Sequence, residues 1–311
     1  MNGNLFAVEV TDTDLKLLRV RRENGTPVAA PVAHVRFNDP SGRGGSRAPD
    51  TLASAMEGIQ EERPQALLVL SSGELDFRDF SFPFEAERKV RNAIDFELST
   101  DYPEEAYVHD HVKSLGREPG YHACIAAMVP RPVLEERVRA LEDAGFRVTG
   151  ITSDVSTLGA AFREEDEALV MDTGERHTLF VLYRSGIPVL LRKIPIGIRD
   201  MVGEPEAGDT GGLAQLGAEV KRTVHSFNAR IGLEVNRLYV TGNLLLHREA
   251  VSSLQKRVRM EIDLRSPGDY GLPLEEAPDA TDVNVFAALI GSALWKRKDG
   301  FFNFLKEGFA R

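Results

Sequence analysis

The residues whose types and spacing could bind a ligand are Asp172, Thr173 and Gly174, with Thr178 four positions further on. An aspartate at the end of an apolar run, a glycine that lets backbone approach closely and a nearby hydroxyl can together hold a phosphate or a hydrated metal ion. The same residues are also ordinary chemistry for the turn of a β-hairpin. Both interpretations stay open at the level of these residues.

Other chemistry-bearing residues predict less. His109 and His111 share one face of a predicted strand, and His122 follows on the next strand, where it could lie opposite them. No cysteine or carboxylate stands at a fixed metal-ligand spacing beside them, so a polar sheet face is the favoured interpretation. The single Cys124 lies in an apolar run and allows no internal disulfide, which is typical of a core residue in a cytosolic protein.

Composition excludes two classes of function. With 38 Lys and Arg against 48 Asp and Glu, the chain carries a formal charge of −10, which argues against a general nucleic-acid surface. No signal pattern is present, and no run approaches the ~20 apolar residues of a membrane span. We therefore expect a soluble polypeptide of about two domains.

The elements that must position Asp172 follow one order twice. Residues 168–197 predict three strands separated by glycine turns, and residues 5–37 predict three more. A helix capped by Asp50 and a strand at 66–70 complete the first half. A long helix over 213–231, a strand at 237–241, a helix–strand pair and a final helix over 285–294 complete the second. Between the halves lie a helix at 84–99, strands at 106–112 and 121–129, and a helix that begins near Pro132.

This duplicated order resembles the actin-like ATPase fold, and the residues resemble one branch of it. The segments 84–103, 133–150, 172–178 and 194–197 are similar to those of the pilus-assembly M proteins and the type II secretion L proteins. The resemblance implies an α/β fold of two duplicated mixed-sheet domains with a small α+β subdomain inserted in the first. It implies a first domain over 1–80 and 150–165 plus the C-terminal helix, an inserted subdomain over 81–149, a second domain over 166–295, and a tail over 296–311.

The tail extends the resemblance. Residues 301–310, FFNFLKEGFA, are similar to the segment that precedes the transmembrane helix of the secretion L proteins. This implies membrane attachment only through a segment beyond residue 311. It also implies that Phe302, Asn303, Phe304 and Leu305 bind as a peptide, within the chain or to a neighbour, in a groove bounded by the 84–99 helix. A simple amphipathic end that packs on its own domain is the alternative.

Three loops hold ATP in this fold, and in this sequence they match the family pattern to different degrees. In the first, residues 9–16, only Lys16 matches the family pattern, while Thr11 replaces a glycine and Asp12 and Asp14 would repel a triphosphate. The second keeps Asp172, Gly174 and Thr178, and the third keeps Gly242. We therefore expect a vestigial nucleotide site and no cofactor, with ATP and Mg²⁺ binding as the alternative.

The resemblance implies a scaffold rather than an enzyme. The expected place is the cytoplasmic face of the bacterial inner membrane, where the chain would dock the N-terminal domain of the secretion ATPase onto the inner-membrane platform proteins of a type II secretion machine. A homodimer and no nucleic-acid partner are also expected. The alternative is an ATP-binding protein like the pilus M protein, whose nucleotide state tunes partner binding. A sugar kinase would need a catalytic base that the sequence does not offer.

Overall fold

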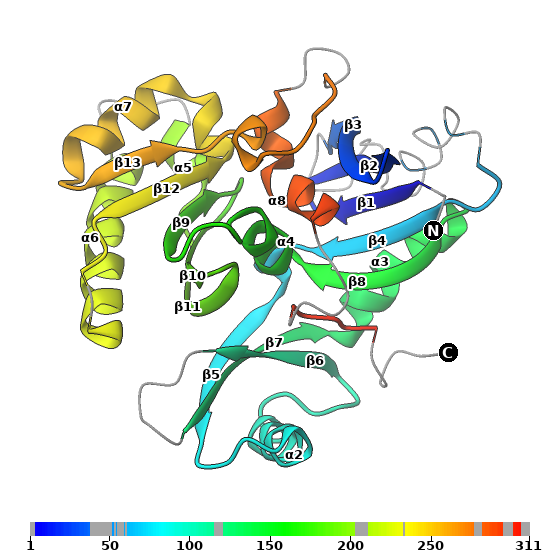
Figure 1. Cartoon of the computed structure of the whole chain (residues 1–311), viewed down its shortest axis with the longest axis horizontal. Helices are drawn as coiled ribbons and strands as arrows, with labels where there is room; N and C mark the ends of the chain where they lie inside the picture. The colour runs from blue at the N-terminus through cyan, green and yellow to red at the C-terminus, as the bar shows by residue number, and fades with distance from the viewer. Residues whose placement is uncertain are drawn as a thin grey trace.

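The computed structural model describes residues 4–37, 52, 54, 59, 61–114, 121–202, 211–232, 234–276, 282–294 and 301–305. Two lobes, each built on a five-stranded sheet, lie side by side, and a smaller three-stranded sheet lies below them (Figure 1). The loop predicted at 38–49 and most of the helix predicted after Asp50 lie outside the described residues.

The sheet of the first lobe runs in the order β3 (Thr26–Arg36), β2 (Asp14–Glu23), β1 (Leu5–Val10), β4 (Gln65–Leu70) and β8 (Arg147–Ser153). The first three strands are antiparallel, whereas β4 is parallel to β1 and β8 is parallel to β4. Asn24 and Gly25 join β2 to β3 with φ of 51° and 86°. Two-residue hairpin turns with positive φ at both positions are favoured, because the backbone twist of such a turn matches the right-handed twist of the strands it joins.

The second lobe repeats this plan. Its order is β11 (Ile187–Ile194), β10 (Thr178–Arg184), β9 (Ala168–Thr173), β12 (Arg237–Gly242) and β13 (Glu261–Leu264). The turn between β10 and β11 is Ser185-Gly186, again with positive φ at both residues. The duplicated succession of strands predicted from the sequence is therefore confirmed. Both lobes also have positive φ at both residues of the turn between their two outer strands.

Helices cover one face of the second sheet. The apolar stripes of α6 (Gly211–Ile231) and α7 (Arg248–Arg257) pack against this face, which presents Leu169, Met171 and Phe180. The opposite face joins the core of the first lobe. The short elements of this lobe are α5 (Ile198–Val202), η2 (Asn243–Leu246) and η3 (Pro267–Tyr270).

The inserted subdomain is a three-stranded sheet in the order β5 (Asp76–Phe82), β7 (His122–Pro130) and β6 (Tyr107–Ser114). The 3₁₀ turn η1 (Ser72–Glu74) leads into it, and α3 (Arg131–Asp143) leads out of it back to β8. Successive side chains of β7 point to opposite faces. Cys124, Ala126 and Met128 pack on α2 (Glu87–Leu98), whereas Ile125, Ala127 and Val129 join the main core.

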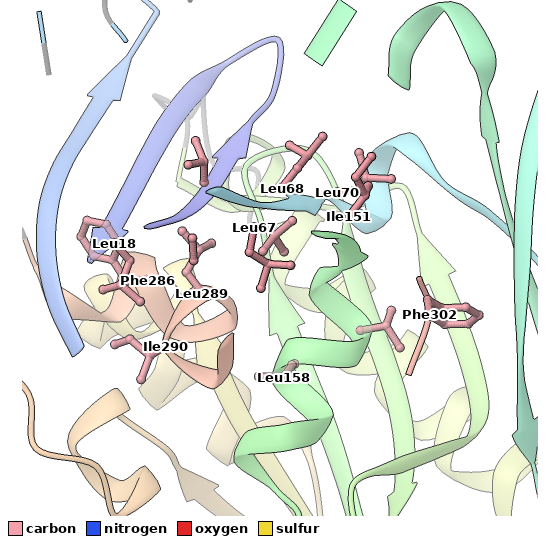
Figure 2. Packing of buried hydrophobic residues seen from close by; sticks show 14 of the residues in the cluster. Leu18, Leu67, Leu68, Leu70, Ile151, Leu158, Phe286, Leu289, Ile290 and Phe302 are labelled. Atoms are coloured by element: carbon pink, nitrogen blue, oxygen red, sulfur yellow. The ribbon is translucent and has the colours of Figure 1, made fainter. Parts of the chain in front are cut away.

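The centre of the molecule is α4 (Asp154–Ala161), which lies between the lobes (Figure 1). It packs against α8 (Ala287–Ile290), which two 3₁₀ turns flank, η5 (Val283–Phe286) and η6 (Gly291–Ala293), in place of the single helix predicted over 285–294. The approach is so close that a Cβ on Gly291 would overlap the Thr157 carbonyl oxygen. Leu158 of α4 belongs to the same buried cluster as Leu289 of α8 and Ile151 of β8 (Figure 2).

No helix among the described residues is both long enough and apolar enough to cross a membrane.

Candidate functional site

A cleft of about 240 Å³ opens where strand ends of the two lobes meet. The turn after β1, the end of β9 and the end of β12 line it, together with η1 and the first residue of α4. Lys16, Asp172, Gly174 and Gly242, four of the five residues that the resemblance assigns to a vestigial nucleotide site, lie in its wall. Thr178, the fifth residue of that prediction, does not line it.

The turn after β1 is filled by its own side chains. The Thr11 hydroxyl oxygen accepts the backbone N–H groups of Thr13 (3.2 Å) and Asp14 (3.1 Å) and donates its proton to the Asp14 carboxylate at 2.8 Å. Thr11 is not among the described residues with positive φ, so its branched side chain causes no backbone strain where it replaces the family's glycine. Because two turn N–H groups are already bonded within the chain, they are not open to a phosphate.

The positive charge of Lys16 is balanced by two neighbouring carboxylates. Its amine lies 2.7 Å from a Glu9 carboxylate oxygen and 3.9 Å from Asp14. Burial alone would lower the pKa of Lys16, but Glu9 and Asp14 raise it above its ordinary value. Burial would likewise raise the pKa of Asp14, but Lys16, His34 and Thr11 together hold it below its usual range. The one cation retained from the first loop is therefore committed to two carboxylates.

In the hairpin of β9 and β10, the hydroxyl of Thr178 does not face the cleft. Thr178 is fully buried and donates to the carbonyl oxygen of Ile196 at 2.7 Å, which ties β10 to the turn after β11. Gly174 N–H donates to the His177 carbonyl at 2.9 Å and closes the turn. Gly242 has φ of 78°, and a Cβ there would overlap an oxygen of Asp172. Glycine is thus required at position 242 on two counts.

Two carboxyls at the base of the cleft have raised pKa values. Burial raises the pKa of Asp172 to about 6, against the opposing effect of Lys16. Burial raises the pKa of Asp154 to about 7, although its carboxylate accepts the backbone N–H of Ser72 at 2.6 Å. A charged carboxylate in a low-dielectric site is costly, so both groups ionise less readily than on the surface.

The sequence did not predict a set of contacts between η1 and the second lobe. We call this set, formed by Ser72 and Leu75 with His177 and Lys193, the clasp. Ser72 of η1 meets the second lobe at two points: its hydroxyl lies 3.1 Å from His177 Nε2, and its carbonyl accepts Lys193 Nζ at 3.0 Å. Lys193 also donates to the Leu75 carbonyl at 2.7 Å. Burial, together with Lys193 and Lys16, lowers the pKa of His177 to about 4, so the ring is neutral at physiological pH.

Arg137 of α3 was also missed. Its guanidinium donates to Asp12 at 2.7 Å and to Glu74 at 2.8 Å, so it joins the β1–β2 turn to η1. Asp12, expected to repel a triphosphate, is instead paired. The only signal in the sequence was a positive charge on the predicted helix, and such charges usually face solvent.

The charge balance of the cleft disfavours a polyphosphate. Among the described residues that line it, the carboxylates outnumber the cations Lys16 and Arg176. The carboxylates are Glu9, Asp12, Asp14, Glu74, Asp154, Asp172 and Glu175. Even with the ion pairs counted, an anion here would meet like charge at short range, where the effective dielectric is low.

The histidines do not form a metal site. His109 lies 3.3 Å from Asp95 and His111 lies 3.7 Å from Glu87, so both face α2. In the register of β6 and β7, Met128 pairs with His109 and Ala126 pairs with His111, so His122 is not opposite them. No group of three metal-ligating side chains is found in the part of the chain that the structure describes.

The tail lies in a second groove, between the first lobe and the inserted subdomain. Phe302, Asn303 and Phe304 are buried. Phe304 N–H donates to the Ile151 carbonyl of β8 at 3.0 Å, and Thr152 donates to the Phe302 carbonyl at 2.8 Å. The tail therefore lies beside β8, the edge strand of the first sheet.

The inserted subdomain forms the other wall of this groove. Asn303 N–H donates to Asp110 of β6 at 2.7 Å, and the rings of Phe302 and Phe77 lie 6.3 Å apart. The docking expected from the sequence is thus present within the chain, but its position is not as predicted. The tail packs on the face of the inserted sheet opposite α2, so the 84–99 helix does not bound the groove.

Comparison with known proteins gives matches in structure alone. No family model matches the sequence, and no curated protein matches it. A PilM-PilN type IV pilus biogenesis complex matches with a TM-score of 0.73 at 19% identity, covering 94% of this chain and 98% of the other. A Bacteroides thetaiotaomicron protein with an actin-like ATPase fold and unknown function matches with a TM-score of 0.53 at 8% identity, over 85% and 91% of the two chains. This chain has the actin-like ATPase fold.

A further solved structure matches nearly the whole length of the chain. The cytoplasmic domain of EpsL, an inner-membrane component of the type II secretion system of Vibrio cholerae, matches with a TM-score of 0.56 at 14% identity. The match covers 99% of this chain and 100% of that one. The fold recognised from the sequence is confirmed, and the cleft described above is the cleft between the two lobes of an actin-like body.

Proposed function

We propose that this chain is a non-enzymatic scaffold at the cytoplasmic face of a bacterial inner membrane, in a type II secretion or allied pilus machine. Its task is to recruit the secretion ATPase, through that enzyme's N-terminal domain, to the inner-membrane platform proteins. The observation that carries the proposal is the state of the turn after β1 in the actin-like cleft. The Thr11 side chain occupies the N–H groups of this turn, and Lys16 forms an ion pair with Glu9.

The likenesses in structure support the same role. The matched proteins include a PilM-PilN complex and the cytoplasmic part of EpsL, which belong to pilus biogenesis and to type II secretion. A scaffold needs a rigid body and binding surfaces rather than turnover. The clasp at Ser72 and the core shared by both lobes supply rigidity without a nucleotide. Attachment to the membrane and self-association into a homodimer belong to the same proposal.

Binding to the N-terminal domain of the secretion ATPase tests the role. We expect a complex with a Kd on the order of micromolar, equally strong with and without Mg-ATP and unchanged in Asp172→Ala. Asp172 lines the cleft, so this variant is the matched control for any nucleotide effect. Absence of a complex at on the order of tens of micromolar would count decisively against recruitment.

An ATP-binding protein is the second candidate, because Asp172, Gly174 and Gly242 still share the cleft. Titration calorimetry with Mg-ATP separates the two candidates. The scaffold proposal expects no saturable heat. Saturable heat that disappears in Asp172→Ala would favour a nucleotide-tuned switch instead.

A further inference from the structure

The inserted sheet has an edge strand with one unpaired side. β5 lies at the end of the strand order β5-β7-β6, so a single neighbouring strand covers it. Among the described residues, no backbone–backbone hydrogen bond beyond the sheet involves residues 76–82. An edge in this state is a template for another strand, because a row of N–H and C=O groups faces outward.

The other edge strands are protected. The tail lies beside β8, and Ala29 of β3 makes backbone hydrogen bonds of 3.0 and 2.9 Å with residues 273–275. β13 has only four residues, β11 holds Pro188 and Lys193, and β6 holds Lys113. Short length, proline and lysine are devices by which strand edges avoid pairing. β5 has no lysine and no proline, is seven residues long and pairs with β7 without a bulge.

A row of stacked aromatic rings follows the same edge. The ring centroids of Phe80 and Phe82 lie 5.9 Å apart with an interplanar angle of 8°, and those of Phe82 and Phe84 lie 5.3 Å apart at 14°. All three rings are half-buried and pack on the small core beneath α2. An added strand with aromatic residues on this face would cover the exposed part of the rings, and aromatic cross-strand pairs stabilise a sheet.

The order of side chains along β5 fits a second copy of the same strand, running antiparallel. When Phe80 stands opposite Phe80 of the second copy, Arg78 stands opposite Phe82 and Asp79 stands opposite Ser81. Directly opposite residues lie on the same face of the sheet, so Arg78 meets an aromatic ring, which attracts a guanidinium. No two like charges are directly opposite in this register.

The neighbouring registers are less favourable. Pairing centred on Asp79 would place this carboxylate opposite itself, and pairing centred on Arg78 would do the same with the guanidinium, and like charges directly opposite destabilise a sheet. Pairing centred on Ser81 would place Pro83, which has no N–H, opposite Asp79. The charges of β5 therefore select the register centred on Phe80.

We propose that the β5 edge is the surface through which this chain associates with a second copy of itself. The two β5 strands pair antiparallel around Phe80, and the two inserted sheets become one continuous sheet. The two-fold axis is perpendicular to this sheet, so both α2 helices lie on the same face and each copy contributes the same residues. This inference rests on the homodimer that the proposed function includes, and it names the surface that forms it.

Disulfide formation between two single variants of the full chain tests the pairing and the register together. Asp79→Cys and Ser81→Cys change exposed residues on the sheet face away from the native Cys124. In the proposed register each new cysteine stands opposite the other position, whereas its own counterpart lies on the diagonal, too far for a disulfide. We expect a disulfide-linked dimer when the two variants are mixed and oxidised mildly, and none from either variant alone.

Sedimentation velocity over a range of concentrations measures the strength of the association. Phe80→Asp places two carboxylates opposite each other at the two-fold axis, so we expect the Kd of the dimer to rise by about 10-fold or more. Phe96→Asp makes the same substitution at a phenylalanine that is 77% exposed on α2, and it should leave the Kd unchanged.

The outcomes separate this inference from the rest of the proposed function. A dimer of the parent protein that gives no disulfide in the mixture would overturn the β5 surface and leave the homodimer standing. A disulfide formed by Asp79→Cys alone would overturn the register centred on Phe80. A parent protein that stays monomeric would contradict both the surface and the homodimer, while recruitment of the secretion ATPase keeps its own binding test.

Discussion

At the scale of single residues, Thr11 decides the character of the first hairpin. Its hydroxyl accepts the backbone N–H groups of Thr13 and Asp14 and donates to the Asp14 carboxylate, all inside the turn. Thr11→Val keeps the branched shape and removes those bonds. We expect the free energy of unfolding to fall by about 1–2 kcal/mol, because buried donors and acceptors lose their partners.

Urea denaturation measures this change. Thr26→Val, at an exposed position that begins β3, is the matched control and should change stability little. Equal stabilities for the two variants would mean that the Thr11 bonds do not hold the turn.

Asp154 predicts a pH dependence of stability. Its pKa is raised from 3.8 to about 7 by burial. Between these values the folded protein binds more protons than the unfolded chain, so this group's contribution to stability is present at low pH and falls as pH rises through the window. Asp154→Asn stays neutral and keeps an oxygen to accept the Ser72 N–H.

Relative to the parent protein, Asp154→Asn should therefore gain about 1–3 kcal/mol between pH 4 and pH 8. Urea denaturation of both proteins across this range measures the difference. A constant difference would show that the Asp154 carboxyl does not titrate in this window.

At the scale of elements, the packing of α4 on α8 depends on a glycine. A Cβ on Gly291 would overlap the carbonyl of Thr157, a rigid backbone group that cannot move alone. We expect Gly291→Ala to lower the free energy of unfolding by about 1–3 kcal/mol through overpacking. Gly268→Ala is the matched control, because a Cβ there meets nothing within 4 Å and its φ is not positive. Thermal melts of the two variants should therefore differ clearly.

At the scale of the whole molecule, one apolar core runs through both lobes. It joins the first sheet, α4, the inner face of the second sheet and the tail phenylalanines. Tyr183 of β10 crosses between the lobes: its ring is fully buried and its hydroxyl donates to the Val155 carbonyl of α4 at 2.7 Å. Because both lobes share this core, we expect them to unfold in one cooperative transition.

Tyr183→Phe should lower the free energy of unfolding by about 1 kcal/mol without splitting that transition. Tyr121→Phe, at a residue 41% exposed, is the control and should be neutral. Calorimetry and circular dichroism should give coincident transitions for both variants. Two resolved transitions in the parent protein would contradict the shared core.

Local patterns in the sequence predicted the succession of strands, the duplicated plan and the turn at Ser185-Gly186, whereas the turn at Asn24-Gly25 was not predicted. The strands and turns follow from local signals, since the period of apolar residues sets the element and glycine sets the turn. The resemblance to the actin-like fold, by contrast, named Lys16, Asp172, Gly174 and Gly242 as one vestigial site, and the structure places these four residues along one cleft.

The contacts between these elements, in contrast, depend on the packing of the whole molecule. It buried the Thr178 hydroxyl on Ile196, brought Ser72 to His177, and placed the tail on the face of the inserted sheet opposite α2. The residues in the last two contacts stand far apart in the chain, and a local pattern states which face is buried but not which partner covers it. That choice depends on how three sheets and α4 pack together, because close packing admits few arrangements of the whole.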